Sequence, residues 1–320
     1  MKKLIIAAAA FAAVLAGCIV MGVGFMMTGG NWRDLSTGST VTYTEYFDGY
    51  FDSLSVRLST SDLRLELSRD GKNRAEISRS EKIDVTLKIA NGELTIGETD
   101  NRSWVDHISF FSFGESRVTL YLTESAYESA YLHLSTGDVF VAEDFTFGDL
   151  SIRVSTGDVN SRARVSGSLT VKGTTGSKTL SGVGSCESIR VDGSTGDVSI
   201  RDAECTTMQI GGSTSDVELN NITAENVTMD VTSGDIEMKN VVAKGTLEAK
   251  ATTGNIEFDL CDGAEVVFKT TTGDIEGSLL SGKMFDAAAT TGDVRVPASD
   301  RTGGECKVHT NSGDIDITVR

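Results

Sequence analysis

The stretch Ser135-Thr136-Gly137-Asp138-Val139 decides the fold, because it returns throughout the C-terminal part of the chain. Its glycine position recurs at 137, 157, 176, 196, 215, 234, 254, 273, 292 and 313, with serine in place of glycine at 215. The steps between these positions are 19 to 21 residues long. A fixed period of about 20 residues is typical of a solenoid, in which each repeat forms one coil and stacks on the next.

We call this five-residue repeated stretch the phrase. Alternating apolar residues flank each copy of it. Leu150, Ile152 and Val154 precede the second copy. Val159, which follows it, has the opposite parity, so the chain must turn a corner at the phrase. Thr-Gly suits a type II turn, whose third position needs a positive φ, and the aspartate can accept hydrogen bonds from nearby backbone amides. We therefore predict an all-β fold, a single-stranded β-helix (β-solenoid) with coils of 19–21 residues.

The predicted corners contain paired glycine and aspartate residues that should recur along one edge of the rod. These turn-forming positions are Gly137, Asp138, Gly157, Asp158, Gly196, Asp197, Gly234, Asp235, Gly273, Asp274, Gly292, Asp293, Gly313 and Asp314. Calcium bridging along this edge is an alternative, but calcium takes six to eight oxygen ligands and the phrase supplies one carboxylate per coil. The turn role is therefore favoured, and no metal or cofactor is predicted.

The composition agrees with many short strands and excludes one class of partner. The chain has 34 glycines and a single proline, Pro297. Its formal net charge is -17. A nucleic-acid-binding protein needs basic patches to neutralise phosphates, so this balance argues against nucleic acid as a partner.

The N-terminus predicts a membrane tether. Lys2 and Lys3 precede Leu4–Met27, an uncharged apolar run long enough to cross a bilayer as a transmembrane helix. This reading is a signal-anchor, with the rest of the chain outside. A rival reading starts from Leu15-Ala16-Gly17-Cys18, which resembles a bacterial lipobox in which Cys18 would be lipidated. A cleaved, secreted form is the third alternative, and the apolar run after Cys18 favours the anchor.

The chain divides into four predicted segments. Residues 1–27 are the signal-anchor, 28–43 a Gly/Ser/Thr linker, 44–134 the irregular N-terminal coils and cap, and 135–320 the regular β-helix with ten TGD-type repeats. Ser59-Thr60-Ser61-Asp62-Leu63 is an early echo of the phrase. Trp104, Phe110, Phe111 and Phe113 are predicted to cap the core, with a partner-contact patch as the alternative.

Few groups suggest chemistry. His107, His133 and His309 show no spacing typical of a metal site or catalytic triad, so no catalytic residues are predicted. Cys186 and Cys205 are one coil apart, which permits a disulfide between adjacent coils. Strand-to-strand geometry is often poor for a disulfide, so a pair of free thiols stays open as the alternative.

Taken together, the N-terminal apolar anchor, Trp104, the Tyr121-Leu122 strand and the repeated phrase resemble a known family. It is the bacterial β-strand-repeat "putative adhesin" family, a domain family of unknown function, here in its membrane-anchored Gram-positive form. The resemblance covers roughly residues 45–320 and implies a β-helix at the cell envelope. It carries no functional residues over to this chain.

The predicted function is a non-catalytic adhesion or binding scaffold. It would be a single-pass protein of the cell membrane with an extracytoplasmic C-terminal body, and its partners would be the membrane and a protein or cell-wall polymer. The alternative is an envelope sensor or regulatory subunit that acts through its transmembrane helix. A polysaccharide-acting β-helix enzyme is least favoured, because coils of near-constant length leave no room for the long loops that build a cleft.

Overall fold

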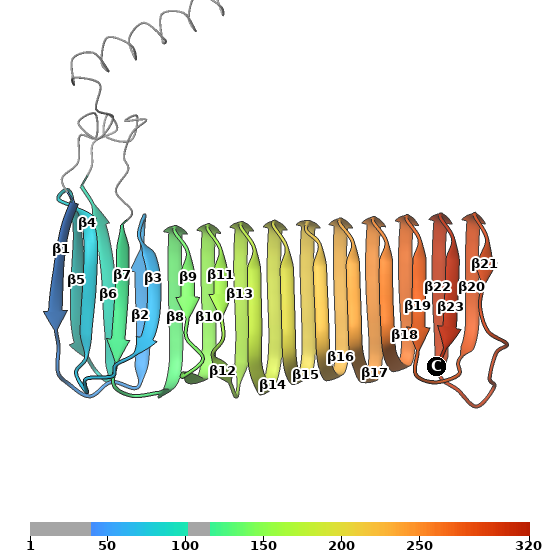
Figure 1. Cartoon of the computed structure of the whole chain (residues 1–320), viewed down its shortest axis with the longest axis horizontal. Helices are drawn as coiled ribbons and strands as arrows, with labels where there is room; N and C mark the ends of the chain where they lie inside the picture. The colour runs from blue at the N-terminus through green and yellow to red at the C-terminus, as the bar shows by residue number, and fades with distance from the viewer. Residues whose placement is uncertain (1–39, 102–115) are drawn as a thin grey trace, which may run out of the picture.

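The computed structural model describes residues 40–101 and 116–320, which form an elongated rod of β-strands (Figure 1). The strands run across the rod, and each coil lies beside the next along its length. The predicted all-β solenoid is confirmed. Within the described residues, no helix is long and apolar enough to cross a membrane. The predicted anchor 1–27, Cys18, His107 and the aromatic residues of 104–113 lie outside the described residues.

The N-terminal end of the rod contains the antiparallel pairings of the fold. β1 pairs with β4, β4 with β7 and β5 with β6 in this way. The strands here are β1 (Thr40–Tyr46), β2 (Ser53–Leu58), β3 (Asp62–Leu67), β4 (Arg74–Ser80), β5 (Ile83–Ala90), β6 (Glu93–Asp100) and β7 (Arg117–Leu122). β1 begins at Thr40, whereas the linker was predicted to continue to residue 43. Its alternation of threonine with valine and tyrosine favours a strand.

The remaining strands pair in parallel with one another. They are β8 (Ala126–Thr136), β9 (Val139–Val141), β10 (Thr146–Thr156), β11 (Val159–Ser161), β12 (Arg164–Val165), β13 (Ser168–Thr175), β14 (Lys178–Thr195), β15 (Val198–Thr214), β16 (Val217–Ser233), β17 (Ile236–Thr253), β18 (Ile256–Thr272), β19 (Ile275–Leu279), β20 (Met284–Thr291), β21 (Val294–Arg295), β22 (Glu305–Ser312) and β23 (Ile315–Val319). Equivalent positions of successive coils are register partners. Ile152 lies beside Val171 and Val171 beside Val191, all of them buried, so the core is a stack of apolar columns.

The phrase glycines lie at the corners with positive φ. Their φ values run from +108° to +146°, more extended than the type II turn that the sequence predicts. The difference has a steric cause: each corner packs directly on the one before it, and a Cβ on Gly157 would overlap the carbonyl oxygen of Gly137. Glycine is therefore required both for its backbone conformation and for the space that it leaves free.

The phrase aspartates bind neighbouring coils together. The Oδ1 atom of Asp138 accepts a hydrogen bond from the amide of Asp158 at 2.8 Å, and Asp216 accepts one from Asp235 at 2.9 Å. The sequence predicts that the aspartate accepts a hydrogen bond from an amide of its own turn. Instead it accepts one from the next coil, because the stacked corners bring the amide of that coil closer. Asp62 of the early echo accepts from the amide of Asp138 at 3.0 Å and so begins this series.

Coil order at both ends of the rod differs from chain order. The sequence predicts that coils stack in the order in which they occur. Instead, β22 lies between β18 and β20, so the last coil of the chain is inserted one place inside the end of the rod (Figure 1). Likewise, β2 lies between β6 and β8. Each inserted coil has the apolar alternation of an internal coil, and insertion covers it on both sides.

Lys178 is an exception in the core, since it occupies the position of the apolar residue that ends the phrase. Its side chain is only 1% exposed, and its ammonium nitrogen has no hydrogen-bond partner among the described residues. A Cβ on Gly173 or Gly193 would meet the end of this side chain, so the two glycines leave the room that the lysine fills. Burial lowers the pKa of Lys178, against the opposing effect of Asp158 and Asp197.

Replacing a phrase glycine should destabilise the rod through two separable effects. We expect Gly254→Ala to lower the free energy of unfolding by about 2–4 kcal/mol, because its φ is +143° and a Cβ would overlap the carbonyl oxygen of Gly234. Gly71→Ala is the matched control: its φ is +70° and nothing lies within 4 Å of its Cβ position, so only the backbone effect of about 1 kcal/mol applies. Urea unfolding followed by circular dichroism measures both. Equal losses would contradict the steric argument.

Removing the buried amine of Lys178 should stabilise the protein. We expect Lys178→Met to raise the free energy of unfolding at pH 7 by about 1–3 kcal/mol, because methionine fills the same space without a desolvated amine. The pKa of Lys178 lies below its ordinary value of 10.5 in the folded state. Between these two values the unfolded state binds more protons, so wild-type stability rises with pH.

The difference in the free energy of unfolding between Lys178→Met and the wild type should therefore decrease as the pH rises toward 10.5. Other groups that titrate at alkaline pH, such as Tyr127, are present in both proteins, so their effects on stability cancel in this difference. Lys172→Met is the control, because the Lys172 side chain is 41% exposed and pairs with Asp192 at 3.2 Å. A Lys178→Met protein that is less stable than the wild type throughout pH 7–10 would show that the amine is compensated.

Candidate functional site

Carboxylates form two parallel columns along the C-terminal half of the rod, and we name them the acidic face. The first column holds phrase aspartates, and the second holds the residue two positions later. The residue between them, such as Val217 or Ile236, is buried, so the alternation of the strand turns both carboxylates outward. The acidic face consists of Asp216, Asp235, Asp274 and Asp314, and of Glu218, Glu237, Glu257, Glu276 and Asp316.

Like charges are direct neighbours in the second column. Glu237 is the register partner of Glu257, and Glu257 is the register partner of Glu276. Neighbouring strands lie about 4.8 Å apart, so Glu257 has a carboxylate on both sides. At such separations two like charges repel by about 1 kcal/mol in water-like surroundings. The column is thus a continuous strip of negatively charged side chains.

Arginines form ion pairs with the carboxylates at the two ends of this column. Arg201 pairs with Glu218 at 2.6 Å, and Arg295 pairs with Asp316 at 3.6 Å. Among the described residues, no ion pair is formed by the three exposed glutamates between these ends. Burial raises the pKa of Glu257, and the neighbouring carboxylates Glu276, Glu237 and Asp235 raise it further. A cation bound along the strip would reverse the second effect.

Two open grooves follow the acidic face. One of about 490 Å³ lies between the glutamate column and Lys239, Asp259 and Ser278, with Phe258 and Gly277 among its lining residues. The other, of about 320 Å³, lies between the aspartate and glutamate columns. Across the part of the chain that the structure describes, no group of three or more His, Cys, Asp or Glu side chains could hold a metal ion.

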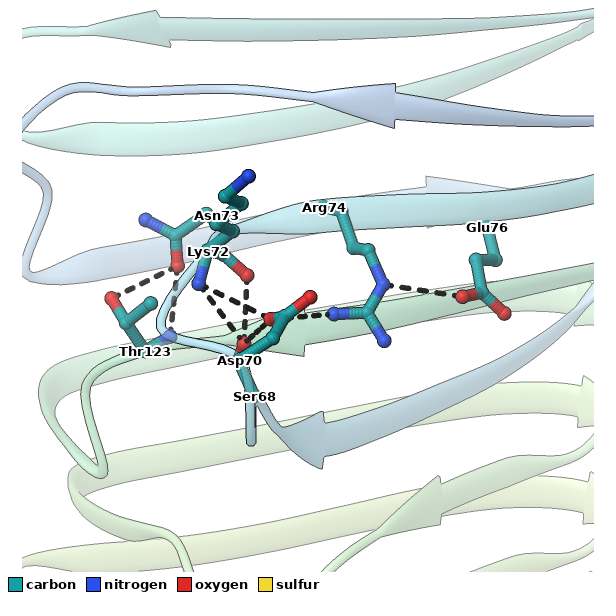
Figure 2. A network of polar contacts seen from close by, with 7 residues as sticks. All are labelled: Ser68, Asp70, Lys72, Asn73, Arg74, Glu76 and Thr123. Atoms are coloured by element: carbon teal, nitrogen blue, oxygen red, sulfur yellow. Dashed lines mark hydrogen bonds and ion pairs between the residues drawn. The ribbon is translucent and has the colours of Figure 1, made fainter.

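A second polar cluster lies at the turn between β3 and β4 (Figure 2). Arg74 binds Asp70 at 2.9 Å and Glu76 at 3.2 Å, and its guanidinium lies 3.8 Å from the ring centre of Tyr121. Asn73 accepts hydrogen bonds at its Oδ1 atom from the amide and hydroxyl of Thr123, at 2.8 and 3.1 Å. These contacts satisfy the groups of the cluster and fasten β4 to the rod, so its role is structural.

The two cysteines predicted to be neighbours are register partners on β14 and β15. Cys186 and Cys205 are both buried, and both thiols are free. The neighbouring thiol lowers the pKa of Cys186 and raises the pKa of Cys205, which burial raises further. The disulfide stays a prediction. The remaining cysteines of the described ranges, Cys261 and Cys306, are fully buried and distant from this pair in the register.

The structure distributes the other predicted residues without bringing them together. His133 is a register partner of Arg57 on β2, whereas His309 lies in the inserted coil, 3.6 Å from Asp286. The glutamate column was missed by the sequence analysis. Its signal is present in the sequence, since an acidic residue stands two positions after the phrase aspartate position in consecutive copies at 218, 237, 257 and 276. A column of like charge is recognisable only once coils are aligned in register.

Solved structures with a similar chain path are distant in sequence. A "putative adhesin" from Bacteroides fragilis has 12% identity and a TM-score of 0.37, covering 88% of this chain and 97% of that one. A "putative lipid binding protein" from Parabacteroides distasonis has 13% identity and a TM-score of 0.45, covering 88% and 98%. A "putative adhesin" from Parabacteroides merdae has 13% identity and a TM-score of 0.38, also covering 88% and 98%. At these scores the likenesses carry no functional argument.

Comparison of the sequence with protein-family models identifies the family of this chain. Among curated proteins, none matches this chain. The family model described as Toastrack DUF4097 matches residues 51–271 and again 209–320, which together span the coils described above. The chain therefore belongs to the Toastrack DUF4097 family.

Proposed function

We propose that this protein is a non-catalytic binding scaffold that presents its acidic face to a basic segment of a partner protein. The observation that carries this proposal is the strip of exposed glutamates 237, 257 and 276, which lies between two arginine-paired ends and forms no ion pair within the described residues. A row of positive side chains lying along the rod would relieve the repulsion that the strip carries. Anionic polymers, including phosphate-rich ones, would be repelled.

The regularity of the coils supports a scaffold over an enzyme. Phrase positions recur every 19 to 21 residues, so successive coils leave little chain for loops that could converge on a substrate. Each groove of the acidic face is lined by equivalent residues of neighbouring coils, which repeats one kind of contact along the rod. Repetition of a weak contact suits binding of an extended partner, because the contributions add along its length.

Neutralising the glutamate strip should weaken the binding of a cationic peptide. We expect wild-type protein to bind decalysine at low salt, with an affinity that falls as ionic strength rises. The variant Glu237→Gln/Glu257→Gln/Glu276→Gln should bind it about 10-fold more weakly, because three contiguous charges are lost. Isothermal titration calorimetry measures both affinities.

The matched control for this experiment changes the same net charge at another position around the coils. Glu187→Gln/Glu204→Gln/Glu225→Gln removes three exposed carboxylates outside the acidic face. This control should retain most of the wild-type affinity. Equal weakening in the two triple variants would show that net charge alone matters and would overturn the proposed face.

We also propose that residues 1–27 tether this scaffold to a membrane, with residues 28–39 as a spacer and the body outside the cytoplasm. The support is the apolar run of the sequence and the position of Thr40, which starts the rod at its N-terminal end (Figure 1). A tether there would hold the rod by one end and leave the acidic face, which lies in the C-terminal half, free to meet a partner.

Protease shaving of intact cells combined with labelled palmitate tests the tether. We expect the body to be shaved from outside and no label to be incorporated, because the apolar run after Cys18 suits a spanning helix. Label that disappears in Cys18→Ala would replace the helix by a lipid anchor and exclude signalling through a transmembrane helix. A body protected on intact cells would contradict an extracytoplasmic location.

A further inference from the structure

A groove of about 470 Å³ crosses four successive coils on the sheet face that precedes the phrase, and we name it the glycine groove. It is lined by residues 153–155, 172–174, 192–194 and 211–213, which are equivalent positions of β10, β13, β14 and β15. Four coils at about 4.8 Å per step make the groove about 14 Å long. It lies around the phrase corner from the acidic face and nearer the N-terminal end of the rod, so the two surfaces are separate.

One end of the glycine groove is positively charged. Arg153 and Lys172 are neighbours in one outward column, which continues toward the N-terminal end of the rod with His133 and Arg57. Lys172 pairs with Asp192 at 3.2 Å, whereas Arg153 forms no ion pair with a described residue. The lining therefore carries two cations against one carboxylate, in a chain whose formal net charge is -17. This local excess of one positive charge favours a ligand with a single negative charge.

The backbone of three glycines forms the floor of the groove. Gly173, Gly193 and Gly212 are register partners in successive coils. The same inward column holds buried valines on both sides of them, Val154 and Val231. Because the glycines have no side chains, the space beneath the floor is open to a side chain from another column.

The ammonium of Lys178 occupies this space and lies against the inner side of the floor. A Cβ on Gly173 would lie 3.3 Å from its Nζ atom, and a Cβ on Gly193 would lie 2.9 Å from it. One layer of backbone thus separates a buried cation, without a hydrogen-bond partner among the described residues, from the groove. A buried cation without a partner is costly, and an anion in the groove would be attracted to it with little water between them.

We propose that the glycine groove binds an acidic oligosaccharide, with its carboxylate beside Arg153 and its neutral sugars extending along the rod. A guanidinium binds a carboxylate through two parallel hydrogen bonds, and the charge of Lys178 beneath the floor adds to the attraction. Sugar hydroxyls donate and accept hydrogen bonds, as do the exposed hydroxyls along one wall of the groove. This wall consists of Ser155, Thr174, Ser194 and Ser213.

The lining selects this class of ligand over others. Apart from the buried Val154, every lining residue is polar, charged or glycine, so a lipid chain would find no apolar surface. A uniformly charged polyanion would place negative charge beside Asp192 and over the uncharged end at 211–213. An acidic peptide would need a strand edge or side-chain pockets, and this groove lies on a sheet face. The site does not depend on the proposed role of the acidic face.

Two probes that carry a single terminal carboxylate test the site: sialyllactose, and aldotetraouronic acid, which is xylotriose with one glucuronic acid. We expect at least one of them to bind with a dissociation constant of about 0.1–1 mM, because the groove is open. The neutral counterparts lactose and xylotriose, and the free acids sialic acid and glucuronate, should bind at least about 10-fold more weakly. Saturation-transfer difference NMR titrations of the full chain in deuterated detergent measure these affinities.

Four variants locate the bound probe. Arg153→Gln should weaken its binding about 10-fold, whereas Arg164→Gln, an exposed arginine outside the groove, should retain the wild-type affinity. Lys178→Met should weaken binding about 2- to 5-fold, and because we expect it to stabilise the fold, this loss cannot come from unfolding. Gly211→Ile should prevent binding by filling the groove, since its Cβ would meet only Asp192 Oδ1, at 3.5 Å.

Failure of both acidic probes to bind at about 5 mM would overturn the proposal. So would equal affinity for the neutral sugars, which would remove the role of the carboxylate, or equal affinity for the free acids, which would reduce the groove to a site for small anions. Equal weakening in Arg153→Gln and Arg164→Gln would show that net charge alone acts. Unchanged binding in Gly211→Ile would place the probe elsewhere on the rod.

Discussion

The structure depends on the contact between successive phrase corners. A backbone carbonyl of one coil lies where the Cβ of the next phrase glycine would be, so glycine leaves that space open. Ser215 is the exception, and it lacks the positive φ of the phrase glycines. The aspartate that follows accepts the amide of the next coil, for example between Asp235 and Asn255 at 2.7 Å. Two short-range requirements thus recur at most steps, and together they hold the coils in one register. Coils of 19 to 21 residues keep this register because a local irregularity away from the corner absorbs the extra residue, as between Ala224 and Val227 of β16.

Register turns sequence repetition into surface columns. Any residue type that recurs at one repeat position forms a stripe along the rod, and the side chains of that stripe share its chemistry. The acidic face arises in this way from residues that are unremarkable one by one. The core obeys the same rule, and an exception shows the constraint: Lys178 enters an apolar column where Gly173 and Gly193 leave room for its side chain. Outward columns can therefore change residue type independently of one another, whereas a change in an inward column must be matched by the side chains packed against it.

The sequence predicts what happens within a coil better than what happens between coils. Alternation and a recurring glycine identify strands and corners, because both signals are local. The direction of the Asp138 hydrogen bond, by contrast, depends on how tightly two corners stack, which periodicity does not contain. The inserted positions of β2 and β22 are likewise invisible, because an inserted coil has the same pattern as one stacked in chain order. The glutamate column was within reach of the sequence, but it needed the coils to be aligned and not only counted.

Insertion of the terminal coils has a physical logic of its own. A solenoid stacked in strict chain order would leave its last strand bound on one side only and with a free end, and such a strand frays. In this chain β22 is bound on both sides, by β18 and β20, and the half-exposed outer coil is connected to the body through chain at both of its ends. The outer coil is held in turn by the chain that follows it, because the amide of Phe285 donates to the Oγ atom of Ser299 at 3.1 Å and the amide of Asp300 donates to the carbonyl of Lys283 at 2.8 Å.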